Sequence, residues 1–86
     1  MGASIDREFI ARQRVIRRAI LAVLYEKRRT GQNGYWPDLT YALGHASEEC
    51  SFALEFLEEL ELVHRDPKSC RITAQGINHF EQETPA

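Results

Sequence analysis

The chain of 86 residues has few cysteines and no long apolar run. Its two cysteines, Cys50 and Cys70, are fewer than the disulfide frameworks of small secreted domains use, so we expect free thiols. A membrane span needs about 20 consecutive apolar residues, and none is present. The first residues also lack the basic and apolar pattern of a secretory leader. These absences predict a cytoplasmic protein.

Motifs that carry chemistry are missing as well. The histidines and cysteines do not show the Cys-x₂-Cys or His-x₃-His spacing of zinc sites. There is no Gly-x-Ser-x-Gly sequence, no glycine-rich phosphate loop and no His-Glu-x-x-His sequence. We therefore expect no metal site, no cofactor and no enzymatic activity. The length predicts one domain over residues 1–86.

The net charge of −2 hides an uneven distribution along the chain. Residues 1–43 contain eight Lys or Arg and four Asp or Glu, a net charge of +4. Residues 44–86 contain three Lys or Arg and nine Asp or Glu, a net charge of −6. Such an asymmetry bears on which partners the protein attracts rather than on its fold.

Apolar spacing predicts three helices. Residues 5–29 repeat apolar side chains every three or four positions, with Ser4 as the expected N-cap. A short helix follows over residues 36–43, because Pro37 suits a first helical position and Gly44 suits a helix C-terminus. Ser47 is expected to cap a third helix with a buried stripe along residues 50–60.

The remainder predicts a β-hairpin and a final helix. The short runs 62–65 and 70–73 flank a turn that contains Pro67, the pattern of two antiparallel strands. Thr73 then precedes a short helix over residues 77–81, and the tail over residues 82–86 is expected to fray.

The order of these elements, together with a pattern of residues from Leu39 to Gly76, resembles that of a known family. The residues of this pattern are Leu39-x-x-x-Leu43-Gly44-x-x-Ser47-x-x-Cys50-x-x-Ala53-Leu54-x-x-Leu57-x-x-Leu60-x-Leu62-Val63-x-Arg65-Asp66-Pro67, followed by Arg71-Ile72-Thr73-x-x-Gly76. They resemble the winged helix-turn-helix domains of small MarR- and PadR-like bacterial and phage regulators. The resemblance covers about residues 15–81 and implies that these residues form the core of the domain. The resemblance implies a mainly α fold with a small two-stranded β-hairpin: a three-helix core, a wing and a short C-terminal helix.

The same resemblance implies a DNA-binding or transcription-associated module. In that family the third helix enters the major groove of double-stranded DNA, and the wing contacts the backbone or the minor groove. Ser47, Ser51 and Phe52 are then the residues nearest the groove. The implied phosphate contacts are His64, Arg65, Lys68 and Arg71 of the wing, with Arg14 and Arg18 of the first helix.

The charge of the third helix departs from the family pattern. Glu48, Glu49 and Glu55 occupy reading positions, and this helix contains no Lys or Arg. Carboxylates that face a polyanion can cost several kcal/mol. The alternative hypothesis is a protein-interaction domain without DNA binding, which docks a basic partner on Glu48, Glu49, Phe52 and Glu55. Phe52 either packs on the first helix or the wing, or is an exposed contact.

A homodimer through the N-terminal helix is a further alternative. Ile5, Phe9 and Ile10 extend past the part of the helix that the core needs. They predict either a contact between two copies or packing within one chain.

Overall fold

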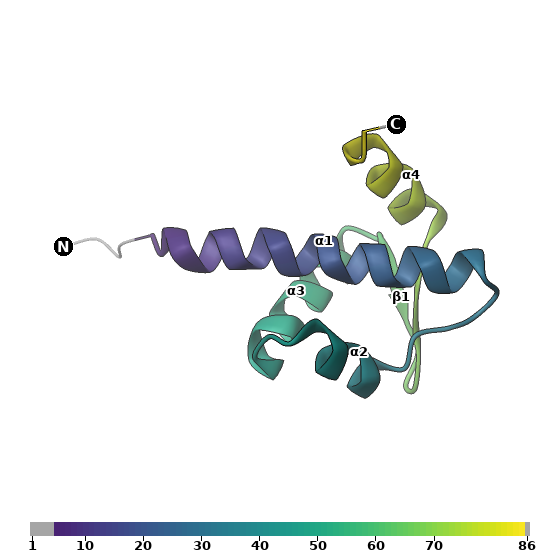
Figure 1. Cartoon of the computed structure of the whole chain (residues 1–86), viewed down its shortest axis with the longest axis horizontal. Coiled ribbons are helices and arrows are strands. Elements are labelled where there is room, and N and C mark those ends of the chain that lie inside the picture. The colour runs from purple at the N-terminus through teal and green to yellow at the C-terminus, as the bar shows by residue number, and fades with distance from the viewer. Residues whose placement is uncertain (1–4, 86) are drawn as a thin grey trace.

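Helices and one β-hairpin build the structure, a computed structural model that describes residues 5–85 (Figure 1). The elements are α1 (Arg7–Arg29), α2 (Trp36–Leu43), α3 (Ser47–Glu59), β1 (Val63–Arg65), β2 (Cys70–Ile72) and α4 (Ala74–Glu83). The sequence predicted this mainly helical architecture with a two-stranded antiparallel hairpin, and the structure confirms it. No helix in residues 5–85 has the length and apolar character needed to cross a membrane.

Helix α1 begins where a side chain satisfies its free amide groups. The Asp6 carboxylate accepts a hydrogen bond of 2.9 Å from the backbone N–H of Phe9, so Asp6 is the N-cap. The prediction of a helix from residue 5 was therefore two residues too early, and the predicted cap Ser4 lies outside the described residues. Basic residues fill the last turn, where they interact favourably with the helix dipole.

A sharp corner joins α2 to α3. Gly44 ends α2 in the left-handed conformation, at a φ of 72°, which glycine adopts without steric cost. The predicted capping role of Ser47 was wrong: Ala46 is the N-cap of α3, and Ser47 is already its first helical residue. The methyl side chain of Ala46 cannot accept a hydrogen bond, so no side chain caps α3.

The hairpin is fixed to the helices by backbone pairing. Val63 pairs with Ile72 and Arg65 with Cys70 across the two strands. Gly34, in the connection between α1 and α2, exchanges two backbone hydrogen bonds with Cys70, of 3.0 and 2.8 Å. The Arg28 guanidinium adds a 2.8 Å bond to the carbonyl of Ile72. The hairpin therefore has a defined position beside α1.

Helix α4 is longer than the sequence indicated. Thr73 caps it as predicted, because its hydroxyl accepts a 3.0 Å hydrogen bond from the N–H of Gly76. The helix spans Ala74–Glu83 rather than residues 77–81, so the tail expected to fray is helical through Glu83. The ring of Phe80 lies 4.9 Å from that of Tyr25 in α1, and this packing holds α4 in place.

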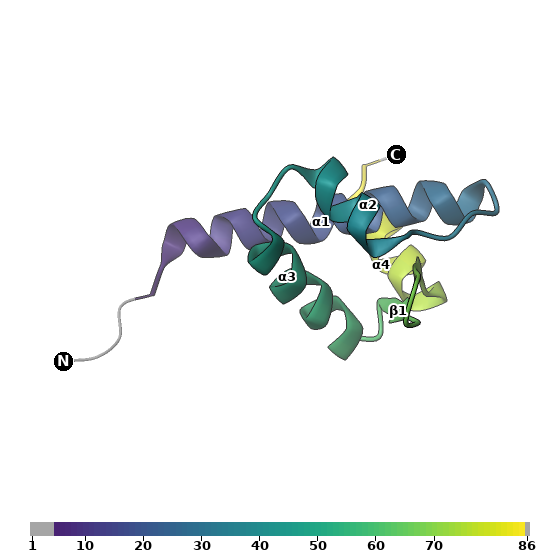
Figure 2. The same ribbon diagram turned by 90° about the horizontal axis from the view of Figure 1, so that it is seen from below.

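The core lies between α1, α3 and the hairpin. Its buried side chains include Ile16 and Ile20 of α1, Leu54 of α3 and Ile72 of β2. Both cysteine thiols are free and buried. Seen from below, α3 and the hairpin lie side by side under α1, and the first turns of α1 project past both (Figure 2).

Candidate functional site

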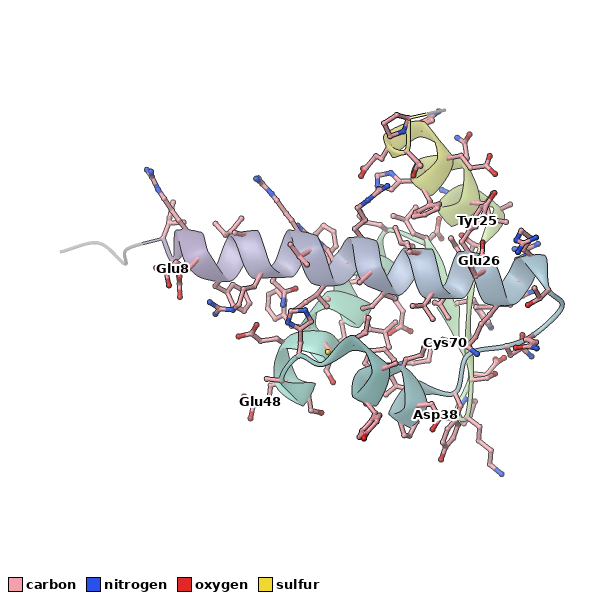
Figure 3. The ribbon with its side chains drawn as sticks, in the orientation of Figure 1. Glu8, Tyr25, Glu26, Asp38, Glu48 and Cys70 are labelled. Carbon is pink, nitrogen blue, oxygen red and sulfur yellow. The ribbon has the colours of Figure 1, made fainter. Side chains whose placement is uncertain are left out.

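Helix α3 carries a line of glutamates on its outward side. Glu48, Glu55 and Glu59 are exposed and lie seven and four residues apart, so they share one face of the helix. Figure 3 shows Glu48 pointing away from the other helices. None of the three has an ion-pair partner among residues 5–85. We refer to these three residues as the acidic ridge.

Two other glutamates of α3 are held by arginines. Glu49 accepts two hydrogen bonds from the Arg12 guanidinium, at 3.0 and 3.1 Å, and Arg65 of β1 lies 3.1 Å from Glu58. The hydrogen bond from Arg12 lowers the pKa of Glu49 below its ordinary value. Glu49 and Glu58 thus tie α3 to its neighbours and are less available to a partner than the acidic ridge.

The Glu49 pair makes stability depend on pH in a predictable direction. Because the pKa of Glu49 is lower in the folded state, the pair stabilises the fold above about pH 4.5 and this contribution is lost as the pH falls below that value. We expect Glu49→Gln to flatten the loss of stability between neutral and acidic pH. Urea unfolding at several pH values measures this. Glu8→Gln, on the exposed start of α1, is the control. If wild type and Glu49→Gln lose the same free energy of unfolding between neutral and acidic pH, the prediction is wrong.

Beside the acidic ridge lies an apolar stripe, formed by Phe52 and Phe56 of α3 and by Leu60, its C-cap. The exposed fractions of these side chains are 54%, 40% and 48%. Both hypotheses for Phe52 hold in part: its ring packs edge-on against that of Phe9 at 5.2 Å, and about half of its surface still meets solvent. Exposed aromatic side chains that are held in place are the type enriched at protein interfaces.

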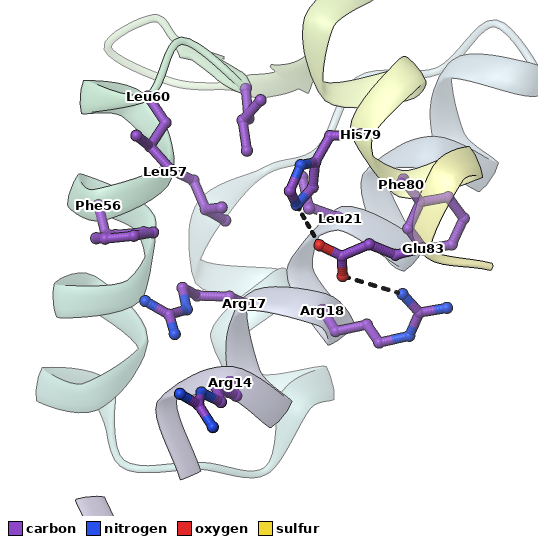
Figure 4. Close-up of a pocket in the computed structure, with 11 residues that line it drawn as sticks. Arg14, Arg17, Arg18, Leu21, Phe56, Leu57, Leu60, His79, Phe80 and Glu83 are labelled. Carbon is purple, nitrogen blue, oxygen red and sulfur yellow. Dashed lines mark ion pairs between the residues drawn. The ribbon is translucent and has the colours of Figure 1, made fainter. Parts of the chain in front are cut away.

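The apolar stripe borders a groove between α1, α3 and α4 (Figure 4). The groove has a volume of about 450 Å³. Its apolar lining includes Leu57, Leu62 and Phe80. Arg14 and Arg17 line the α1 side, and the guanidinium of Arg17 lies 4.3 Å from the centre of the Phe56 ring.

The cations expected to contact phosphate fall into separate groups. Arg18 of α1 faces α4, where it pairs with Glu83 at 3.8 Å and donates to Thr84. The hairpin turn that carries Lys68 extends from α1 in the opposite direction to α4 (Figure 1). In the hairpin, His64 lies 3.0 Å from Asp66, whereas Lys68 and Arg71 are exposed and have no carboxylate partner in the described residues.

The structure also places the remaining predicted residues. Ser47 is exposed at the start of α3, and Ser51 is half-buried one turn later. Sequence reasoning missed Arg17 and Phe56 as a surface, and its placement of Leu60 in the buried stripe of the third helix was wrong, because Leu60 is 48% exposed. The four-residue spacing from Phe52 to Phe56 and Leu60 was visible in the sequence, but the exposure of these side chains depends on how α1 and α4 pack. In residues 5–85, no cluster of His, Cys, Asp and Glu side chains is arranged to hold a metal ion.

Comparison of the chain with protein-family models, with curated proteins and with solved structures gave no match.

Proposed function

We propose that this chain is a winged helix-turn-helix domain that docks a protein partner on α3 and does not read DNA. Three features support the winged-helix assignment: the corner at Gly44 between α2 and α3, the hairpin that follows α3, and the pairing of Gly34 with Cys70. Under this assignment, the outward face of α3 is the surface with which such domains meet their targets.

The acidic ridge is the observation that carries the proposal. In a helix-turn-helix the outward face of the second helix of the corner meets the major groove, and here that face presents three carboxylates and no cation. DNA affinity depends on Lys and Arg that neutralise phosphates. A partner with a basic surface removes the repulsion and gains attraction, so protein docking fits the charge of this face.

DNA binding through the hairpin is the second candidate. Lys68 and Arg71 favour it, because both are exposed without a carboxylate partner in the described residues. Two cations make few phosphate contacts, and the ridge lies on the neighbouring helix. This candidate therefore predicts weak binding that salt removes.

Two measurements separate the candidates. Labelled duplex DNA is titrated with the protein at several salt concentrations, and we expect no saturable binding even at the lowest one. In parallel, a photo-crosslinking residue replaces Ser51, and the proteins captured in a lysate of the native host are identified by mass spectrometry. We expect captured partners with basic surfaces, because opposite charge steers association.

The control is a variant with the same charge change elsewhere. The ridge variant, Glu48→Gln with Glu55→Gln and Glu59→Gln, should lose these partners. The matched variant, Glu8→Gln with Glu26→Gln and Glu61→Gln, has the same net charge and should retain them. Salt-dependent DNA binding by the wild type that is lost in Lys68→Ala with Arg71→Ala would overturn the proposal in favour of the second candidate. Equal capture by both triple variants would also overturn it.

A further inference from the structure

We infer that the partner is an amphipathic helix that lies along the apolar stripe, with carboxylates toward Arg14 and Arg17 and with Lys or Arg toward the acidic ridge. This inference rests on the proposed function and names the kind of partner that the α3 surface fits. It comes from the different charges on the two borders of the stripe, described next.

The length of the apolar stripe matches a helix. Phe52 lies eight residues before Leu60, the C-cap of α3, which corresponds to about 12 Å along the axis. The apolar anchors of a bound amphipathic helix at positions i, i+3, i+4 and i+7 cover about 10.5 Å. A partner helix of two to three turns therefore covers the whole stripe with one apolar face.

The border of the stripe on the α1 side is cationic. Arg14 lines the groove and has no carboxylate partner among residues 5–85. Arg17 is held over the Phe56 ring, which fixes its guanidinium at the edge of the stripe. The third arginine of the groove, Arg18, is already occupied by Glu83 and Thr84 of the C-terminal segment. Carboxylates of a partner thus meet Arg14 and Arg17.

The opposite border of the stripe is anionic. Glu55 and Glu59 of the acidic ridge lie on the solvent side of the stripe, and neither is paired within the described residues. Cationic side chains of a partner helix meet these carboxylates. Since the two borders carry opposite charge, a helix with the same pattern of charges binds in one direction only.

A small ligand explains less of this surface. The cavity of about 450 Å³ involves Phe56 and Leu60 but not Phe52, so a molecule confined to it leaves half of the Phe52 ring in water. It also makes no use of the unpaired glutamates on the other border. A helix contacts the whole stripe and both charged borders.

The experiment uses synthetic peptides of equal composition. Each is about 15 residues long, since shorter isolated helices are marginal in water. The segregated peptide carries Leu anchors, Glu on one border and Lys on the other, and the mixed peptide alternates the same Glu and Lys on both borders. Fluorescence anisotropy with the full chain should show the segregated peptide binding about ten-fold more tightly, as expected for several exposed ion pairs.

The direction in which the peptide binds along α3 gives a second test of the inference. A paramagnetic label on the N-terminus of the segregated peptide should broaden amide signals at one end of α3. A peptide with the Glu and Lys borders exchanged should bind with its direction reversed and broaden signals at the other end. Broadening at both ends by both peptides would overturn the oriented binding.

Single and double variants measure what each border of the stripe contributes to peptide binding. Phe56→Ala should weaken both peptides at least ten-fold, and Arg14→Gln should reduce the preference for the segregated peptide about three-fold. Arg71→Gln, on the hairpin outside the groove, is the matched control and should change nothing. Glu55→Gln with Glu59→Gln should reduce the preference by a similar factor from the other border.

The outcomes distinguish this inference from the proposed function. The inference is overturned if neither peptide binds, if the two bind equally, or if dodecanoate occupies the groove and the peptides do not. The proposed function still stands in those cases if the ridge variant loses its crosslinked partners. If Arg14→Gln weakens the peptide and the ridge substitutions do not, the groove binds helices but the acidic ridge has no docking role.

Discussion

Replacing Leu54 with Ala should lower the free energy of unfolding by about 3 kcal/mol. The side chain of Leu54 is 0% exposed near the middle of α3 and belongs to the hydrophobic core. Its truncation loses the transfer free energy of the buried atoms and leaves a cavity that helices fixed on both sides fill only in part. A domain of this size has a total stability of about 4–13 kcal/mol, so the loss is a large share.

Urea unfolding followed by the helical circular dichroism signal measures this effect. Tyr41→Ala is the control, because Tyr41 is 91% exposed and its truncation should change stability by at most about 0.5 kcal/mol. A loss below about 1 kcal/mol for Leu54→Ala would mean that the core packs less tightly around α3 than the structure shows.

Gly76→Ala should also cost about 3 kcal/mol. Gly76 is buried in the first turn of α4, and an added Cβ would collide with the backbone carbonyl of Leu62 and lie 2.6 Å from Cγ1 of Ile72. The carbonyl cannot rotate away as a flexible side chain can, because it accepts a 3.0 Å hydrogen bond from the N–H of Thr73. Relief of the clash therefore moves α4 away from the hairpin.

The adjacent position provides the control for this prediction. Gln75→Ala is exposed in the same turn, and Gln and Ala have similar helix propensities, so its stability should stay within about 0.5 kcal/mol of wild type. Thermal unfolding compares the two variants. A Gly76→Ala protein as stable as Gln75→Ala would show that α4 is not packed closely on the hairpin.

Much of the fold was predictable because its signals are local. The spacing of apolar residues predicted α1, α2 and α3, and the turn at Gly44 and the hairpin around Pro67 follow from local backbone preferences. The failures have tertiary causes. Helix α4 extends past its apolar residues because Tyr25 and Arg18 of α1 contact Glu81 and Glu83 near its end. The sequence of residues 74–86 alone does not show that these α1 residues contact the end of the helix.

The candidate site was predictable only in part for the same reason. Glu48 and Glu55 were recognisable as an acidic face from the sequence. That Glu49 is instead held by Arg12 depends on a contact between residues 37 positions apart. The groove of Arg14, Arg17 and Phe56 is assembled from α1, α3 and α4, so the chemistry of each residue was visible while their proximity was not.

The two buried thiols give the molecule its own reporters of local opening. Cys50 sits in α3 and Cys70 in β2, and burial raises the pKa of both thiols, so neither reacts readily while its element is in place. The rate at which an alkylating reagent labels Cys50 therefore reports how often α3 opens locally, and the labelling rate of Cys70 reports the same for the hairpin. A ligand that stiffens α3 alone would slow the labelling of Cys50 and leave that of Cys70 unchanged.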